Sequence, residues 1–230
     1  MENGILARLS EADLALLRPH LELVNLPLRT QLHSRNRRIE YAYFILSGFA
    51  SVVAYDERER GVEVGLIGRE GMAGVAVILD ADRSPHETFM QNAGSGVRIK
   101  ASDLRAAVEG SASLRAILLR YGHALFVQTA YTALAYGRSK LEERLARWLL
   151  MAYDRVDGDE VAVTHEFLAM MLGVRRPGVT VALKLLENSG LIQRDRQSIR
   201  IVDRNGLMLS SNGAYGAPEA EFRRLFGDEP

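Results

Sequence analysis

Hydrophobic positions follow a short, strand-like pattern in the first half of the chain. Between residues 23 and 101, short apolar runs are separated by Gly, Asp, Ser and Pro. Many short strands at roughly even spacing favour an antiparallel barrel or jelly roll. A short amphipathic helix precedes them, with Ser10 as its N-cap and Pro19 near its end. The expected strands are 41–46, 50–55, 62–67 and 96–99.

The pattern then changes to the longest helical segment of the chain, residues 111–136. One stripe of this helix recurs at spacings of three and four, which favours a helix–helix dimer. A polar residue is costly in a monomer core without a partner, which is a second reason to expect the stripe at a dimer seam. A second stripe containing Ile117 and Leu134 could face the barrel while the first faces a partner, which also favours the dimer. The alternative is a helix packed on its own domain. The expected seam is Leu118, Tyr121, Leu125, Gln128 and Thr132.

Gly137 interrupts this helix, and a new one is predicted directly after it. Ser139 and Glu142 have the spacing of a capping box, in which the serine caps the helix and the glutamate reaches back. The new helix is expected to run to about Tyr153. We therefore place a domain joint at residues 137–139.

A compact unit of two short helices begins at Thr164. Thr164 is a suitable N-cap, Gly173 a suitable left-handed C-cap, and Pro177 fits the first turn of the second helix. Two short helices joined by a tight turn are typical of a helix-turn-helix, whose second helix enters the major groove of DNA. The alternative is an ordinary helical hairpin with a solvated basic face. The apolar face of the second helix is expected to contain Val179, Ala182, Leu183 and Leu186.

The segment after Gly190 predicts a β-hairpin placed as a wing. Two apolar runs flank the polar turn 195–197, and Arg194, Arg196 and Arg200 would lie within reach of phosphates. Lysine and arginine supply much of the affinity for DNA by neutralising phosphates. The candidate DNA contacts are Thr164, Arg175, Arg176, Pro177, Thr180, Val181, Lys184, Arg194 and Arg196.

Charge and composition narrow the classes of function. The 230 residues carry 29 basic and 29 acidic side chains, but residues 161–210 have a net charge of +3 and residues 1–110 a net charge of −2. The absence of cysteine excludes disulfides and thiolate-held metals, and the five scattered histidines predict no local zinc site. Without an 18-residue apolar run or a signal-like N-terminus, we expect a cytoplasmic chain with no membrane partner.

In the order and type of these motifs, the chain resembles the Crp/Fnr family of bacterial transcription regulators. The resemblance covers about residues 10–205. In the first half it rests on residues 43–50 (YFILSGFA) and 68–74 (GREGMAG), and in the second on residues 172–174 (LGV) and 183–187 (LKLLE), together with Arg176 and Val179.

The resemblance implies an α+β protein of four parts. These are a cyclic-nucleotide-binding-like jelly roll that senses an effector (1–110), a dimerisation helix (111–138), a winged helix-turn-helix domain (139–212) and a C-terminal tail (213–230). It also implies a homodimer that binds a pseudo-palindromic double-stranded DNA operator beside a promoter, with RNA polymerase as a further partner.

Two departures from the family pattern affect the expected ligands. Nucleotide-binding members have a Gly-Glu pair and then an Arg-Ser or Arg-Thr pair; this chain has Gly74-Val75 and, at a short spacing, Arg83-Ser84. Thr129 matches a threonine with which those members contact the base of the bound nucleotide. We therefore expect an unidentified effector other than cAMP, and no cofactor or metal.

The second departure concerns DNA reading. Arg176 matches a guanine-reading arginine of the family, but Pro177 stands where an acid usually reads cytosine. The operator should therefore differ from the best-known one of the family.

Two other classes of function compete with a DNA-binding regulator. A signalling module could bind a small ligand in the same fold without binding DNA. An enzyme is the third class, but the sequence has no Walker loop, no GxSxG motif and no pair of carboxylates beside a histidine. We therefore expect no enzymatic activity.

Overall fold

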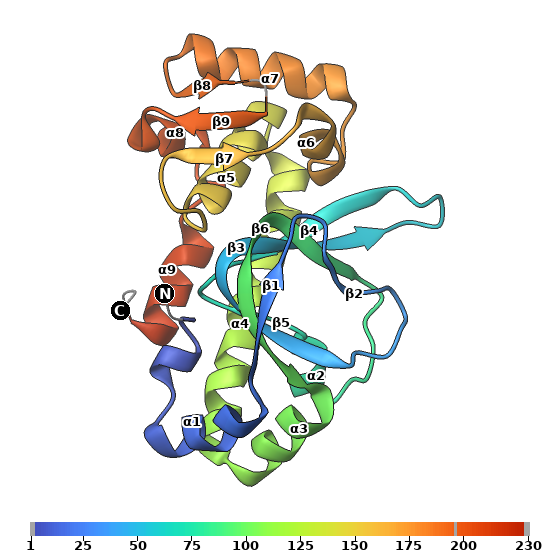
Figure 1. The fold of residues 1–230 in the computed structure, drawn as a ribbon. Helices are drawn as coiled ribbons and strands as arrows, with labels where there is room; N and C mark the ends of the chain where they lie inside the picture. Colours follow the sequence, from blue (N-terminus) through green and yellow to red (C-terminus); the bar gives the residue numbers. More distant parts are fainter. Residues whose placement is uncertain (1–2, 196, 228–230) are drawn as a thin grey trace. The chain divides into compact units, whose positions relative to one another are not determined.

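The computed structural model describes residues 3–195 and 197–227. The described chain is a mixed α+β protein with an antiparallel β domain, a long helix and a C-terminal helix-turn-helix with a small sheet (Figure 1). It divides into two compact units. The first contains the chain up to Val52, Ile67–Phe126 and the chain from Phe222; the second contains Val53–Leu66 and Val127–Glu221.

The N-terminal helices of the first unit follow the predicted capping. The side chain of Ser10 accepts a hydrogen bond from the backbone N–H of Asp13 at 3.1 Å, which confirms Ser10 as N-cap. The helix gives way to a 3₁₀ turn that contains Pro19, because proline cannot donate the next helical bond. The elements are η1 (Leu6–Arg8), α1 (Glu11–Leu17) and η2 (Arg18–His20).

The antiparallel sheet of this domain has the strand order β1-β6-β3-β4, with β2 paired to β6 and β5 paired to β3. Strands β1 and β6 pair in a register that runs from Glu22 opposite Arg98 to Leu26 opposite Gly94. Its strands are β1 (Glu22–Leu26), β2 (Gln31–His33), β3 (Tyr41–Tyr55), β4 (Gly61–Ile67), β5 (Met72–Ala73) and β6 (Glu87–Lys100).

The expected break between strands 41–46 and 50–55 is wrong, because β3 is continuous. Gly48 lies within it at φ +69°, in the left-handed region that glycine enters without strain. A Cβ at this position would lie 2.6 Å from the carbonyl oxygens of Asn92 and Ala93. Gly48 therefore marks a close approach of two strands and not the end of one.

Helices close the core of the first unit. They are α2 (Val75–Ile78), α3 (Ala101–Gly110), the first part of α4 (Ala112–Arg138) and the last turns of α9 (Ala217–Phe226). Phe222 and Phe226 pack against the same apolar cluster as Phe44 and Leu104. The backbone oxygen of Phe226 also accepts a hydrogen bond from Nε of Arg8 at 3.0 Å.

The second unit packs its helices around a three-stranded antiparallel sheet of order β7-β9-β8. The buried side of α5 contains Trp148 and Leu149, among others. The elements are α5 (Leu141–Tyr153), β7 (Glu160–Ala162), α6 (His165–Met171), α7 (Arg176–Asn188), β8 (Ile192–Arg194), β9 (Ser198–Ile201) and α8 (Arg204–Ser210).

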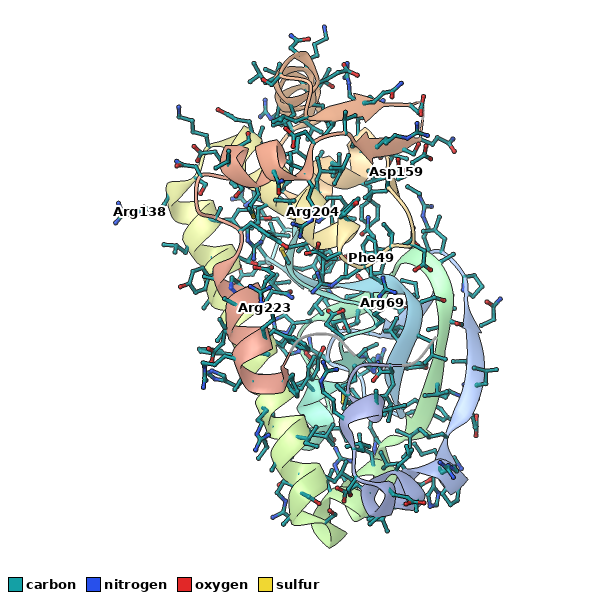
Figure 2. The ribbon with its side chains drawn as sticks, turned by 90° about the vertical axis from the view of Figure 1, so that its left-hand side faces the viewer. Phe49, Arg69, Arg138, Asp159, Arg204 and Arg223 are labelled. Atoms are coloured by element: carbon teal, nitrogen blue, oxygen red, sulfur yellow. The ribbon has the colours of Figure 1, made fainter. Side chains whose placement is uncertain are left out.

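The capping box was predicted one residue too early. Helix α4 continues through Gly137 to Arg138, and the N–H of Ser139 still donates to the carbonyl of Ala135 at 2.9 Å. Lys140 is the N-cap of α5, and its N–H donates to the carboxylate of Glu143 at 2.8 Å. Arg138, the last residue of α4, projects away from the ribbon in Figure 2.

The burial of α4 corrects the predicted dimer seam. Leu118 is fully buried and Tyr121 is 3% exposed, both in the core of the first unit, where the hydroxyl of Tyr121 donates to the carbonyl of Met72. Leu125 packs half-buried against a second core cluster of that unit. Leu134, expected to face the barrel, is exposed instead. The predicted seam therefore packs within the chain, whereas of the second stripe Ile117 packs against the core and Leu134 does not.

The polar residues of that stripe are buried because the chain itself supplies their partners. The side chain of Gln128 accepts from the N–H of Leu66 at 2.7 Å and donates to its carbonyl at 3.2 Å. The hydroxyl of Thr132 donates to the carbonyl of Gln128 and accepts from Arg147 at 3.1 Å. Leu66 lies 62 residues from Gln128 and Arg147 lies 15 residues from Thr132, so these partners could not be seen in the pattern of the helix.

Among the described residues, no helix is both long enough and apolar enough to cross a bilayer.

Candidate nucleic-acid interface

The helix-turn-helix of the second unit is formed as the sequence predicts. The hydroxyl of Thr164 accepts from the N–H of Phe167 at 3.2 Å and caps α6. Gly173 follows α6 at φ +61°, in the left-handed conformation expected of a C-cap glycine. Helix α7 then begins at Arg176, and Pro177 lies in its first turn, where its missing N–H has no intrahelical role.

Helix α7 has one buried and one exposed face. The buried face is the predicted one, and it packs Val179, Ala182, Leu183 and Leu186 into the unit. On the exposed face Val181 is 60% exposed, and Pro177, Lys184 and Leu185 are also exposed. An apolar side chain on such a face can contact a thymine methyl group in the major groove.

Three cations lie exposed at the start of α7 and along it: Arg175, Arg176 and Lys184. In the described part of the chain, none of the three has a carboxylate within ion-pairing distance. Thr180 is half-buried, and its hydroxyl donates to the carbonyl of Arg176 at 3.2 Å and lies 3.4 Å from Nδ1 of His165. Burial lowers the pKa of His165, and the cations Arg194 and Arg176 lower it further. This face can therefore attract phosphates through three unpaired cations.

The wing is present, but its arginines are engaged within the unit. Arg194 donates through Nε to the carboxylate of Glu187 at 2.8 Å, and this bond lowers the pKa of Glu187. Arg200 pairs with Glu160 and, at 3.4 Å, with Asp159. Both arginines are therefore paired within the unit, and their contact with phosphates stays a prediction. The third wing arginine, Arg196, lies outside the described residues.

The expected effector residues lie in different surroundings. Gly74, at φ +106°, precedes α2, and Val75 begins that helix half-buried. The exposed Arg83 donates through Nε to Asp82 at 3.0 Å, and the hydroxyl of Ser84 lies 3.2 Å from Nδ1 of His86. Thr129 belongs to the second unit. Arg83 and Ser84 thus bond to their sequence neighbours, and their role toward an effector stays a prediction.

A group of contacts that the hairpin Val53–Leu66 makes within the second unit was not predicted from the sequence. Nε1 of Trp148 donates to the buried carboxylate of Glu63 at 2.7 Å, and Gln128 bonds to the backbone of Leu66. Val62 lies against Gly173 in the turn of the helix-turn-helix. The one available signal was the position of the polar Gln128 in an otherwise apolar stripe.

Comparison with known proteins agrees with this geometry. Residues 143–209 match the Crp-like helix-turn-helix domain family. No curated protein matches the sequence. Among solved structures, a protein from Eubacterium rectale assigned to the crp/fnr family of transcriptional regulators is 18% identical, with a TM-score of 0.72 over 91% of this chain and 98% of that chain. FixK2 from Bradyrhizobium japonicum is 16% identical, with a TM-score of 0.71 over 82% and 96% of the two chains.

The matched helix-turn-helix and the exposed face of α7 are those of a DNA-binding transcription regulator. Residues 143–209 thus form a Crp-like helix-turn-helix domain, and the described chain has the fold of solved Crp/Fnr structures.

Proposed function

We propose that this protein is a cytoplasmic, homodimeric regulator that reads a pseudo-palindromic DNA operator through α7 and acts together with RNA polymerase. The observation that carries the proposal is the exposed face of α7, where Arg175, Arg176 and Lys184 have no carboxylate partner among the described residues. Unpaired cations beside exposed apolar side chains suit a surface that meets phosphates and base edges together.

The exposed face of α4 supports the dimer. Seven exposed residues recur along this face at spacings of alternately three and four, which is the spacing of a coiled-coil seam. Phe126 is 69% exposed and Leu119 is 42% exposed, although both are large apolar side chains. The side chains in the C-terminal part of this face are small, so two helices can approach each other closely there. The seam consists of Ala116, Leu119, His123, Phe126, Ala130, Ala133 and Gly137.

For the first unit we propose an effector other than cAMP. Val75 offers no carboxylate to a ribose hydroxyl, and the guanidinium of Arg83 is bonded to Asp82. Titration calorimetry with cAMP is expected to show no binding at micromolar concentrations, whereas micromolar or tighter binding would contradict this part of the proposal.

Selection of duplexes from a random DNA pool tests the proposed function. The protein should enrich a motif with two inverted half-sites whose centres are about one helical turn apart, because a two-fold dimer presents two copies of α7. A pool that stays unenriched after repeated rounds would instead support a ligand-binding module without DNA recognition.

A further inference from the structure

We propose that Tyr136 and Arg144 are positioning residues for DNA reading. Tyr136 lies near the end of α4 and Arg144 in the first turns of α5, and both bond to the turn that precedes the recognition helix α7. This inference rests on the proposed function, because it concerns how α7 is held when it meets DNA. All of the residues involved belong to the second unit.

The contacts converge on the carbonyls of Met171, the last residue of α6, and of Leu172, its C-cap. The hydroxyl of Tyr136 donates to the carbonyl of Met171 at 2.5 Å, and Nη2 of Arg144 donates to the carbonyl of Leu172. The guanidinium carbon of Arg144 lies 4.0 Å from the centre of the Tyr136 ring, so the two side chains also stack on each other. We call Tyr136 and Arg144 together the turn clamp.

The clamp supplies donors that the helix itself cannot provide. The last carbonyls of an α-helix have no intrahelical partner, and an external donor fixes where the chain leaves the helix. Burial raises the pKa of Tyr136 to about 12, so its hydroxyl keeps its proton and stays a donor at neutral pH. A guanidinium is a charged donor, and charge-assisted bonds are stronger than neutral ones.

The turn is also held from a third direction. Gly173 directly follows the clamped carbonyls, and a Cβ on it would lie 2.9 Å from Cγ2 of Val62 and 3.9 Å from Cε1 of Tyr136. The hairpin Val53–Leu66 therefore contacts the same turn as the clamp. The turn is thus bounded by α4, α5 and the hairpin, and α7 begins only four residues after Leu172.

The side chains beside the clamp leave a small cavity. Hydrogen bonds therefore hold the turn on this side more than apolar packing does. A cavity of about 20 Å³ lies among Thr132, Tyr136, Arg144, Arg147 and Leu172. Its volume is close to that needed for a single water molecule. Nε of Arg144 and Nε of Arg147 are both buried and have no hydrogen-bond partner in the described chain. Apolar packing alone would not keep the turn in one place on this side.

Loss of the clamp should therefore affect base reading more than general attraction to DNA. Hydrogen bonds to base edges need accurate placement of α7, whereas contacts between cations and phosphates tolerate small shifts. Affinity for an operator should fall, and affinity for a scrambled duplex should change little. A role in stability alone would not change the ratio of the two affinities.

The test compares operator and scrambled duplex for the single variants Tyr136→Phe and Arg144→Met and for the double variant. Each single variant should reduce operator affinity about three- to tenfold, the range expected for one lost hydrogen bond, and scrambled affinity less than about twofold. Arg144→Lys keeps a charged donor and should restore part of the ratio. Tyr131→Phe and Arg138→Met are matched controls on α4, and both should leave the ratio unchanged.

Two results would overturn the positioning role. One is an unchanged affinity ratio in the double variant, and the other is an equal loss on both duplexes. Tyr136→Phe keeps the ring and serves as the mildest variant; circular dichroism should show wild-type helix content for it. If Arg144→Met does not fold, Tyr136→Phe alone decides between these outcomes. A wild-type protein that does not distinguish the duplexes would instead contradict the proposed function, on which the clamp depends.

Discussion

Arg176 stands at the first position of α7, exposed and without a carboxylate partner among the described residues. A guanidinium there can donate two hydrogen bonds to O6 and N7 of guanine. Arg176→Ala should cost about 1–3 kcal/mol per half-site and relax the preference at one base pair. Binding isotherms on the operator and on operators altered at single positions measure both effects.

Lys184 provides the control for Arg176. It lies two turns further along the same exposed face, where it suits a phosphate better than a base. Lys184→Ala should weaken all duplexes alike and reduce the magnitude of the salt slope by roughly one per half-site. If Arg176→Ala behaved in the same way as Lys184→Ala, Arg176 would be a phosphate contact.

Gly173 combines a positive φ with a close neighbour, and the two contributions can be separated. Gly173→Ala should lower the free energy of unfolding by about 1–2 kcal/mol for the left-handed backbone, with a further loss for the contact with Val62. Gly190→Ala is the matched control, because Gly190 has φ +71° and no atom within 4 Å of its Cβ position. Urea unfolding should show the larger loss for Gly173→Ala; equal losses would mean that Val62 moves aside at little cost.

At the scale of elements, the seam on α4 leads to a direct prediction. Replacing Leu119 and Phe126 by aspartate should dissociate the dimer, because a two-fold contact would bring like charges together in an apolar seam. Arg120→Glu is the control, since Arg120 is exposed on the same helix outside the seam. Sedimentation should give a monomer for the double variant and a dimer for the control; a dimer in both would exclude this face as the interface.

The elements that could be predicted from the sequence are those defined by local interactions. The helix-turn-helix depends on the cap at Thr164, the left-handed glycine at Gly173 and a buried face with helical spacing, all within 25 residues. The two faces of α4 could not be assigned in this way. Their assignment depends on Leu66, which bonds to Gln128 from 62 residues away.

The candidate site shows the same division. Arg176 and Lys184 could be identified because helical spacing alone places them opposite the buried face of α7, and Arg175 because it directly precedes that helix. The sequence could not show that Arg194 is paired with Glu187, because a strand and a helix must first be packed together. The turn clamp escaped prediction for the same reason, since it joins residues from three helices.

At the scale of the whole molecule, the C-terminal tail is part of the folded structure. Its start is fixed in the second unit, where the hydroxyl of Tyr215 donates to Asp154 at 2.5 Å and Arg204 donates to the same carboxylate at 2.9 Å. The chain then passes within α9 into the first unit, where Phe222 and Phe226 pack against the core. The chain therefore crosses between the two units four times, and the last crossing lies within α9.

This connection predicts that the tail stabilises the first unit. Replacing both Phe222 and Phe226 by serine should lower its free energy of unfolding by about 2–4 kcal/mol, because each ring is partly removed from water. Arg223→Ser is the control, since Arg223 is exposed on the same helix. Calorimetric melting should show the loss only in the double phenylalanine variant; unchanged melting would mean that the rings contribute little to the core.

The central claim is that the second unit reads DNA sequence. The most direct test is to measure the affinity for an operator and for a scrambled duplex at several salt concentrations and to compare the two. We predict that the operator binds at least about 10³-fold more tightly. We also predict that the logarithm of each binding constant falls linearly with the logarithm of salt concentration. Equal affinity for the two duplexes, or binding that does not respond to salt, would contradict the claim.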